Sequence, residues 1–170
     1  EIANNITVID INNDSLSLLI KRMKEKYDII FKNVFCENAL FHSNKKYDLI
    51  IGNPPYGDLL SKEYKNNKKD KYNNIALTFL NYFQNSLTDK GILYFIVPHS
   101  FSRAGLGSKK WRKEVKEKKS VYEIIDVGNP FFDITLEQII IGLNNEENNE
   151  ILTGSIRKNR EMRSVSFEDF

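Results

Sequence analysis

The sequence has 170 residues, of which 41% are hydrophobic and 12% aromatic, a composition typical of one globular domain with a real core. It contains no apolar run long enough to span a membrane and no signal-peptide pattern, and its single cysteine excludes an internal disulfide. Two histidines and one cysteine argue against a zinc site, and a formal net charge of +2 does not by itself indicate a nucleic-acid partner.

The first elements are predicted to alternate between strand and helix. The hydrophobic pattern predicts a strand, a helix and a second strand at residues 6–11, 14–27 and 28–35. Asp14 or Ser15 is predicted to cap the helix. Such alternation indicates a parallel sheet with helices on its faces. Asp10, at the end of the first strand, is a candidate acceptor for ribose hydroxyls, with a solvated carboxylate as the alternative.

The most informative stretch is YDLIIGNPPYGD, residues 47–58. Its apolar run is typical of a buried strand, and Asn53, Pro54, Pro55 and Tyr56 follow at once. Each proline fixes its own φ and restricts the residue before it, so the loop is predicted to be rigid. A rigid corner at the carboxyl end of a strand is where open α/β sheets bind ligands.

Such a corner has the groups needed to hold an amine for alkylation. If the Asn53 side-chain oxygen and the Pro54 carbonyl accept both N–H protons of an exocyclic amine, its lone pair faces an incoming methyl group, and no strong base is required. Tyr56 offers an aromatic face for stacking on a base turned out of a helix. A Pro-Pro turn with a packed tyrosine is the alternative interpretation.

The motif YDLIIGNPPYG resembles the catalytic motif of S-adenosylmethionine-dependent amino-methyltransferases. The closest resemblance is to the N6-adenine DNA methyltransferases of restriction-modification systems, of the Type I and Type IIG kind. In that superfamily Asn at the first position goes with adenine and Ser with N4-cytosine. The resemblance implies a Rossmann-like α/β fold: a mostly parallel sheet with helices on both faces and an antiparallel last strand.

The resemblance also assigns cofactor roles. It implies that Asp10 binds the ribose of S-adenosylmethionine and that Asn53 borders the cofactor as well as the target. Family members usually carry an Asp that contacts the cofactor's adenine where this sequence has Asn38, and Glu37 is the alternative for that contact.

One part of the family pattern is not found in the sequence. A ribose-binding acid lies roughly 20 residues after the glycine-rich turn of related folds, whereas Asp10 has nine residues before it. The glycine-rich turn and the first strand that carries it are therefore expected to be absent. The sequence also opens with Glu1 rather than Met. We expect a fragment that binds S-adenosylmethionine weakly or not at all by itself.

Two lysine-rich segments follow the corner. A long loop is predicted between Tyr56 and the next helix, with five lysines against two acidic residues from 61 to 72. Lys65, Lys68 and Lys69 are candidates for DNA phosphate contacts, and a solvated face is the alternative. Residues 109–119 hold seven basic residues against two acidic ones and are predicted to form a helix capped by Ser108.

The remaining pattern completes the sheet. A helix is predicted over 75–87, a turn at 89–91, and strands over 92–98, 121–128 and 134–143, the last two antiparallel. The family places an aromatic residue before the final strand, where it stacks on the flipped base opposite the NPPY tyrosine. Phe131 is our choice over Phe132, and a pair of core phenylalanines is the alternative.

Residues 1–143 are thus predicted to be a partial catalytic domain, and 144–170 a linker or the start of a target-recognition region. The predicted function is transfer of a methyl group from S-adenosylmethionine to the N6 amine of a flipped adenine in double-stranded DNA, without a metal. The resemblance implies a bacterial or archaeal cytoplasm, and a restriction or specificity subunit or fused domain as partner. A protein-glutamine or RNA amino-methyltransferase is one alternative, and a non-catalytic DNA-binding module is another.

Overall fold

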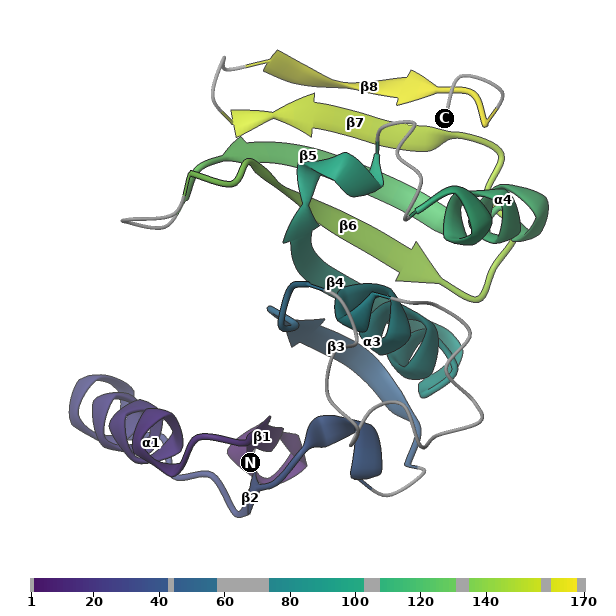
Figure 1. The fold of residues 1–170 in the computed structure, drawn as a ribbon. Helices are drawn as coiled ribbons and strands as arrows, with labels where there is room; N and C mark the ends of the chain where they lie inside the picture. The colour runs from purple at the N-terminus through teal and green to yellow at the C-terminus, as the bar shows by residue number, and fades with distance from the viewer. Residues whose placement is uncertain are drawn as a thin grey trace. The chain divides into compact units, whose positions relative to one another are not determined.

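The computed structural model describes the chain in six stretches: residues 2–42, 45–57, 74–102, 108–130, 135–156 and 160–167 (Figure 1). The chain divides into two compact units, Glu1–Asn44 and Lys45–Phe170. Each unit has its own sheet. No helix among the described residues is both long and apolar enough to cross a bilayer.

Unit 1 is a small β-α-β arrangement, as the alternating pattern predicts. Strand β1 (Thr7–Asp10) pairs in parallel with β2 (Asn33–Cys36), and α1 (Asn13–Tyr27) connects them. Short 3-10 helices precede β1 at Ile2–Asn5 and follow β2 at Ala39–Phe41.

Strand β2 is shorter than the predicted strand over 28–35 because α1 ends in a left-handed turn. Asp28 closes the helix with a φ of 53°, and its N–H donates to the Lys24 carbonyl. The next residue, Ile29, donates to the Met23 carbonyl and so continues this C-cap. Extended backbone pairing therefore begins only at Asn33.

Asn12 caps α1, so the prediction of Asp14 or Ser15 as the cap is wrong. The Asn12 Oδ1 accepts hydrogen bonds from the backbone N–H groups of Asp14, at 2.9 Å, and Ser15, at 3.0 Å. Asp14 instead lies inside the first turn, where its charge favours the positive end of the helix dipole.

Replacing Asn12 with alanine is expected to destabilise unit 1 by about 1 kcal/mol, because two N–H groups lose their acceptor. Chemical unfolding followed by circular dichroism measures the change. Asn13→Ala, one residue further into the same exposed turn, is the matched control and is expected to change stability by less than ~0.5 kcal/mol. Equal effects of the two substitutions would contradict the capping role.

Unit 2 contains a six-stranded sheet in the order β3-β4-β6-β5-β7-β8 (Figure 1). The strands are β3 (Tyr47–Gly52), β4 (Leu87–Pro98), β5 (Val121–Gly128), β6 (Gln138–Asn144), β7 (Ile151–Ser155) and β8 (Arg160–Val165). The pairings make β3, β4, β5 and β7 run in one direction and β6 and β8 in the other. The predicted antiparallel strand before residue 144 is therefore present as β6.

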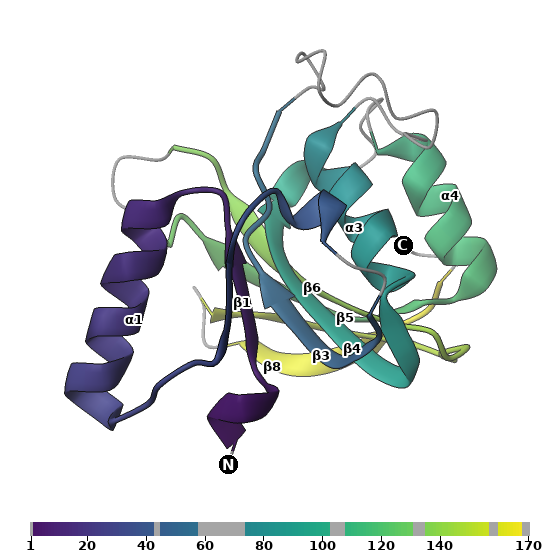
Figure 2. The same ribbon diagram turned by 90° about the horizontal axis from the view of Figure 1, so that it is seen from below.

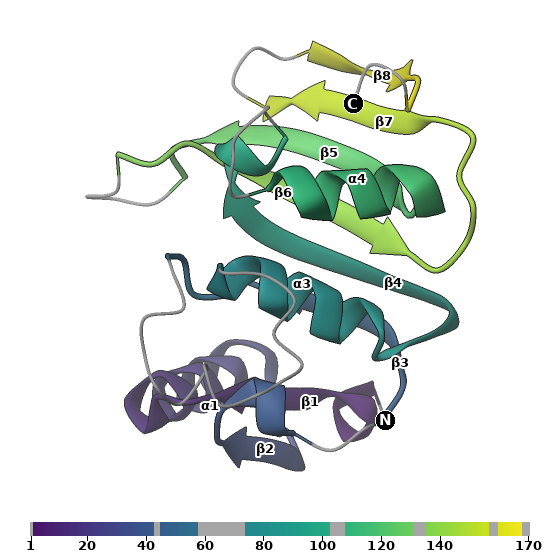
Figure 3. The same ribbon diagram turned by 45° about the vertical axis from the view of Figure 1, so that its right-hand side comes forward.

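The two α-helices described in unit 2 cover one face of this sheet. Helix α3 (Ile75–Gln84) lies over β3 and β4, and α4 (Lys109–Lys118) lies over β5 and β6 (Figures 2 and 3). Their apolar side chains pack on the inward side chains of the strands to form the core. Its most deeply buried members are Ala76, Leu77, Leu80, Leu87, Leu93, Val97, Trp111, Val121, Ile139, Ile141, Leu143 and Ile151.

Strand β3 differs from the buried strand that its apolar run predicts. Among the described strands it pairs only with β4, so it lies at one edge of the sheet. Leu49 and Ile51 are 59% and 73% exposed. They alternate with Ile50 along the strand and so point to the other face. The apolar run therefore predicted the strand correctly but not its burial.

The predicted turn at 89–91 falls within β4, which begins at Leu87, and the pairing of β4 with β3 is interrupted there: Leu87 pairs with Tyr47, and the next pair is Ile92 with Leu49. Leu87 is 1% exposed, and the pairing register shifts between Tyr47 and Leu49. Gly91 is closely packed, because a Cβ there would lie 2.7 Å from the Tyr47 carbonyl oxygen. The glycine that suggests a turn in the sequence thus lies in an irregular part of the strand, where it permits close approach of two backbones.

The tail after residue 144 contains β7 and β8, where the sequence predicts a linker or the start of a recognition region. β7 pairs in parallel with β5, so these residues extend the sheet. The polar run before them is a hydrogen-bonded turn: the Asn148 amide donates to the Lys119 carbonyl at 2.8 Å and to Asn144 Oδ1 at 2.9 Å. Asparagines that suggest a boundary instead return the chain to the sheet. The boundary after residue 143 itself stays a prediction.

Candidate functional site

The NPPY motif forms a corner at the carboxyl end of β3. Gly52 is the last residue of the strand and packs on the ring of Phe95, whose Cε1 would lie 3.0 Å from a Cβ at position 52. Pro54 is buried, and the peptide bonds of the described residues are all trans. The corner ends at Gly57, whose φ of 116° suits glycine and no other residue.

The start of α3 is attached to this corner. The backbone N–H of Ile75 donates to the Gly57 carbonyl at 3.0 Å, and the Asn74 side chain caps α3 by accepting from the Leu77 N–H at 3.2 Å. The corner is therefore held by β3 on one side and by the N-terminus of a buried helix on the other.

The Tyr56 hydroxyl lies within hydrogen-bond distance of two oxygens of the corner and the sheet. It is 2.8 Å from Asn53 Oδ1 and 3.1 Å from the carbonyl oxygen of Ile96 on β4. Burial raises the pKa of Tyr56 to about 12. The hydroxyl is therefore protonated at neutral pH and acts as a donor.

The Ile96 carbonyl is accessible to Tyr56 because of where the β3–β4 ladder ends. The last pair of this ladder is Gly52 with Phe95, and Ile96 is the next residue of β4. The Tyr56 hydroxyl thus takes the position that a further residue of β3 would occupy. Sequence reasoning missed this bond, since no local pattern connects two residues that are 40 positions apart.

The residues of the corner differ in their exposure. Asn53 is exposed at the surface, Pro54 is fixed beneath it, and the Tyr56 ring is half-buried. The carboxamide of Asn53 carries both donor and acceptor atoms, and the prolines restrict the backbone around it. The structure brings Asn53 and Tyr56 together, and their roles toward a substrate stay a prediction.

Two of the three predicted cofactor residues, Asp10 and Asn38, belong to unit 1, and the third, Asn53, belongs to unit 2. Asp10 is exposed at the end of β1, where one carboxylate oxygen accepts from the Asn12 N–H at 2.7 Å. Asn38 caps the short helix Ala39–Phe41, since its Oδ1 accepts from the Leu40 N–H at 3.1 Å. Their assignment to the cofactor stays a prediction.

The alternative to Asn38, Glu37, has a partner of its own. Its carboxylate contacts Nδ1 of His42, a 9% exposed histidine whose ring lies 4.6 Å from that of Phe35. The sequence predicted no contact between these two residues. Glu37 thus has a structural role that holds the turn after β2.

Four predicted site residues lie outside the described residues. They are Phe131, the proposed base-stacking aromatic, and Lys65, Lys68 and Lys69, the proposed phosphate contacts. Helix α4, the second basic segment, is described: Trp111 and Val115 are buried, and Lys109, Arg112, Lys113 and Lys116 border a hollow of about 200 Å³. Its contact with DNA stays a prediction.

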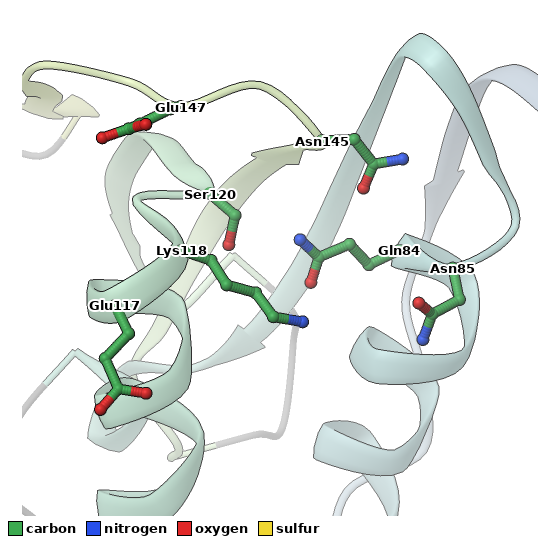
Figure 4. Close-up of a pocket in the computed structure, with 7 residues that line it drawn as sticks. All are labelled: Gln84, Asn85, Glu117, Lys118, Ser120, Asn145 and Glu147. Carbon is green, nitrogen blue, oxygen red and sulfur yellow. The ribbon is translucent and has the colours of Figure 1, made fainter.

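A polar pocket of about 330 Å³ lies at the other end of the sheet (Figure 4). It is formed where α3 and α4 end, beside the start of β4 and β5, whereas the NPPY corner lies at the carboxyl end of β3. Gln84 and Lys118 point into it from the two helices (Figure 4). This pocket is therefore separate from the predicted site.

Comparison with solved structures establishes the fold. The methyltransferase subunit of a type I restriction-modification system from Streptococcus thermophilus superposes with a TM-score of 0.69 at 17% sequence identity, over 94% of this chain and 39% of that one. At this identity the likeness concerns the fold alone. The predicted Rossmann-like methyltransferase fold is confirmed.

Two curated relatives share sequence with part of the chain. A protein of Methanocaldococcus jannaschii, named as a type II restriction enzyme and methyltransferase, is 38% identical over 82 residues, which are 46% of this chain and 7% of that protein. The type II restriction enzyme and methyltransferase RM.Eco57I of Escherichia coli is 32% identical over 110 residues, 58% of this chain and 11% of the enzyme. The chain therefore spans only a small part of these relatives.

A family model covers most of the chain and confirms the resemblance seen in the NPPY motif. The model describes the Eco57I restriction-modification methylase and matches residues 2–132, which include both β1 and the corner at Asn53. The chain therefore belongs to the Eco57I restriction-modification methylase family.

Proposed function

We propose that the protein containing this chain transfers a methyl group from S-adenosylmethionine to the N6 amine of adenine in double-stranded DNA. The observation that carries the proposal is the corner itself: an exposed Asn53 held beside Tyr56 at the carboxyl end of β3, with a buried Pro54 between them. Asparagine rather than serine at this position favours adenine over cytosine as the target, within the resemblance on which the motif rests.

Asn53 and Pro54 would hold the target amine. The Asn53 side-chain oxygen and the Pro54 carbonyl accept one N–H each, which fixes the nitrogen and directs its lone pair outward. These acceptors also stabilise the positive charge that the nitrogen gains as it forms its new bond to carbon. The surplus proton then leaves to solvent. Tyr56 would stack on one face of the base, and Phe131 on the other.

The residues of unit 1 fit a cofactor with a ribose. S-adenosylmethionine, when bound, supplies a methyl group on a sulfonium, whose sulfur keeps the electron pair of the broken C–S bond. Asp10 is exposed and uses one carboxylate oxygen for Asn12, which leaves acceptor capacity for ribose hydroxyls. Asn38 and the turn that it caps would border the cofactor's adenine. Weak cofactor binding by the isolated chain is part of this proposal.

The partners follow from the substrate. Duplex DNA is the proposed substrate, with Lys65, Lys68 and Lys69 as phosphate contacts, and a restriction or specificity subunit or fused domain is the proposed assembly partner. Membership of a restriction-modification methylase family and the proposed DNA substrate favour a bacterial or archaeal cytoplasm as the proposed location.

The full-length protein incubated with tritium-labelled S-adenosylmethionine and duplex DNA tests the proposal. Digestion to nucleosides is expected to release label as N6-methyldeoxyadenosine. Label in N4-methyldeoxycytidine, in RNA or in a glutamine-containing peptide would replace the proposal with the corresponding amino-methyltransferase. DNA binding without transfer of label, unaffected by Asn53→Ala, would indicate a non-catalytic module.

A further inference from the structure

The Tyr56 hydroxyl faces one more acceptor than it can satisfy. It has a single proton, and both of its partners, Asn53 Oδ1 and the Ile96 carbonyl, are oxygens that only accept. It can therefore donate to one of them at a time. The other oxygen lies 2.8 or 3.1 Å from a hydroxyl oxygen without a hydrogen between them, which is unfavourable.

A half-turn of the Asn53 carboxamide removes this conflict. The turn exchanges Oδ1 and Nδ2, two atoms of nearly the same size, and needs no movement of the backbone. Nδ2–H then donates to the Tyr56 hydroxyl oxygen, and the Tyr56 O–H donates to Ile96. Each hydrogen-bond donor then has an acceptor. Asn53 Oδ1 now occupies the former position of Nδ2.

Resting on the proposed function, we propose that the Tyr56 hydroxyl positions the Asn53 carboxamide for methyl transfer. The chain of hydrogen bonds runs from Asn53 Nδ2–H to Tyr56, and from the Tyr56 O–H to the Ile96 carbonyl. It turns Oδ1 toward the target amine, where an acceptor is needed. The opposite orientation would present N–H donors to the N–H groups of the amine.

The last acceptor in this series of hydrogen bonds, the Ile96 carbonyl, belongs to the sheet. Ile96 lies on β4, where it pairs with Ile140 of β6, and its neighbours Phe95 and Val97 are 3% and 0% exposed. The carbonyl is thus fixed by the core. Burial also raises the pKa of Tyr56 to about 12, which keeps its hydroxyl a donor throughout the neutral range. Tyr56 therefore connects the exposed side chain of Asn53 to a rigid part of the sheet.

The test is Tyr56→Phe in the full-length protein, because phenylalanine keeps the ring for stacking and removes only the hydroxyl. The single-turnover rate of methyl transfer to duplex DNA is expected to fall roughly 3- to 10-fold, the effect of one neutral hydrogen bond that orients a catalytic group. The affinity for DNA and the fluorescence of 2-aminopurine at the target position are expected to stay within twofold.

Tyr94→Phe is the matched control. Tyr94 is a half-buried tyrosine of the same strand as Ile96, and its hydroxyl donates to Glu123 at 2.8 Å, away from Asn53. This variant is expected to keep the wild-type rate. A Tyr56→Phe rate equal to that of wild type would overturn the positioning role. Loss of DNA affinity or of base flipping in Tyr56→Phe, with an unchanged rate of methyl transfer, would also overturn it, because the role of Tyr56 would then be limited to stacking on the base.

An activity-independent measurement separates this proposal from the proposed function. In protein labelled with ¹⁵N in its asparagine side chains, the hydrogen bond from Nδ2 to Tyr56 is expected to slow exchange of one Asn53 amide proton, and Tyr56→Phe to restore fast exchange. Equal exchange in both proteins overturns the positioning role. Failure of wild type to methylate adenine, with slowed exchange present, would overturn only the assignment of the substrate.

Discussion

Asn53→Ala is expected to reduce methyl transfer by the full-length protein roughly 10²- to 10³-fold, the loss that follows removal of one preorganised group from a site of developing charge. The substitution removes the side-chain acceptor of the corner and leaves the Pro54 carbonyl in place. Because Asn53 is exposed and bonded only to Tyr56 among the described residues, the fold is expected to stay intact. Incorporation of tritiated methyl groups into duplex DNA at saturating substrate measures the effect.

A matched asparagine shows whether the loss is specific to the corner. Asn145 is an exposed asparagine of the same unit at the other end of the sheet, where its amide makes a 3.4 Å contact with the Thr88 carbonyl. Asn145→Ala is expected to retain wild-type activity within about twofold, since it removes no group near the site. Activity of Asn53→Ala within threefold of wild type would contradict the role of the corner.

The corner was predictable because its signal is local. An apolar strand, a glycine, and two prolines flanked by Asn53 and Tyr56 are consecutive residues, and each proline acts on its own dihedral and on that of its neighbour. The same holds for the alternation of strand and helix in unit 1 and for the helix predicted over 75–87, of which α3 forms residues 75–84. Periodicity reports which face of an element is apolar, and such features do not depend on distant residues.

The features that the sequence did not predict depend on contacts between distant residues. The bond from Tyr56 to Ile96 needs the register of β3 against β4, and the exposure of Leu49 needs the position of β3 in the sheet. The polar run from 144 to 150 was interpreted as a boundary because asparagine favours turns. The pairing of β7 with β5 shows that this turn leads back into the sheet, and the contact of Asn148 with Lys119 holds the turn in place.

Charge patterns gave the least information about structure. The basic segment 109–119 was correctly predicted as a helix, but Ser108 makes no side-chain cap bond. Its hydroxyl donates instead to the Ser100 carbonyl at 3.4 Å. What fixes α4 in place is a thin apolar stripe, because its other side chains are Lys, Arg and Glu. Trp111 and Val115, 1% and 2% exposed, are its buried apolar side chains.

Trp111→Ala is therefore expected to destabilise unit 2 by about 3–5 kcal/mol, a large part of the stability of a typical domain. The indole ring lies 6.2 Å from the ring of Phe101, and its removal leaves a cavity beneath α4. With Val115 as its remaining anchor, the helix would also keep several positive charges at close spacing, which favours local unfolding. A lower urea midpoint and faster hydrogen exchange over residues 109–118 would report both effects.

Lys113→Ala, on the exposed side of the helix, is the control and is expected to change stability by less than ~0.5 kcal/mol, because its 3.8 Å ion pair with Glu117 lies at the surface. A Trp111→Ala protein as stable as this control would show that α4 is held by something other than its apolar stripe.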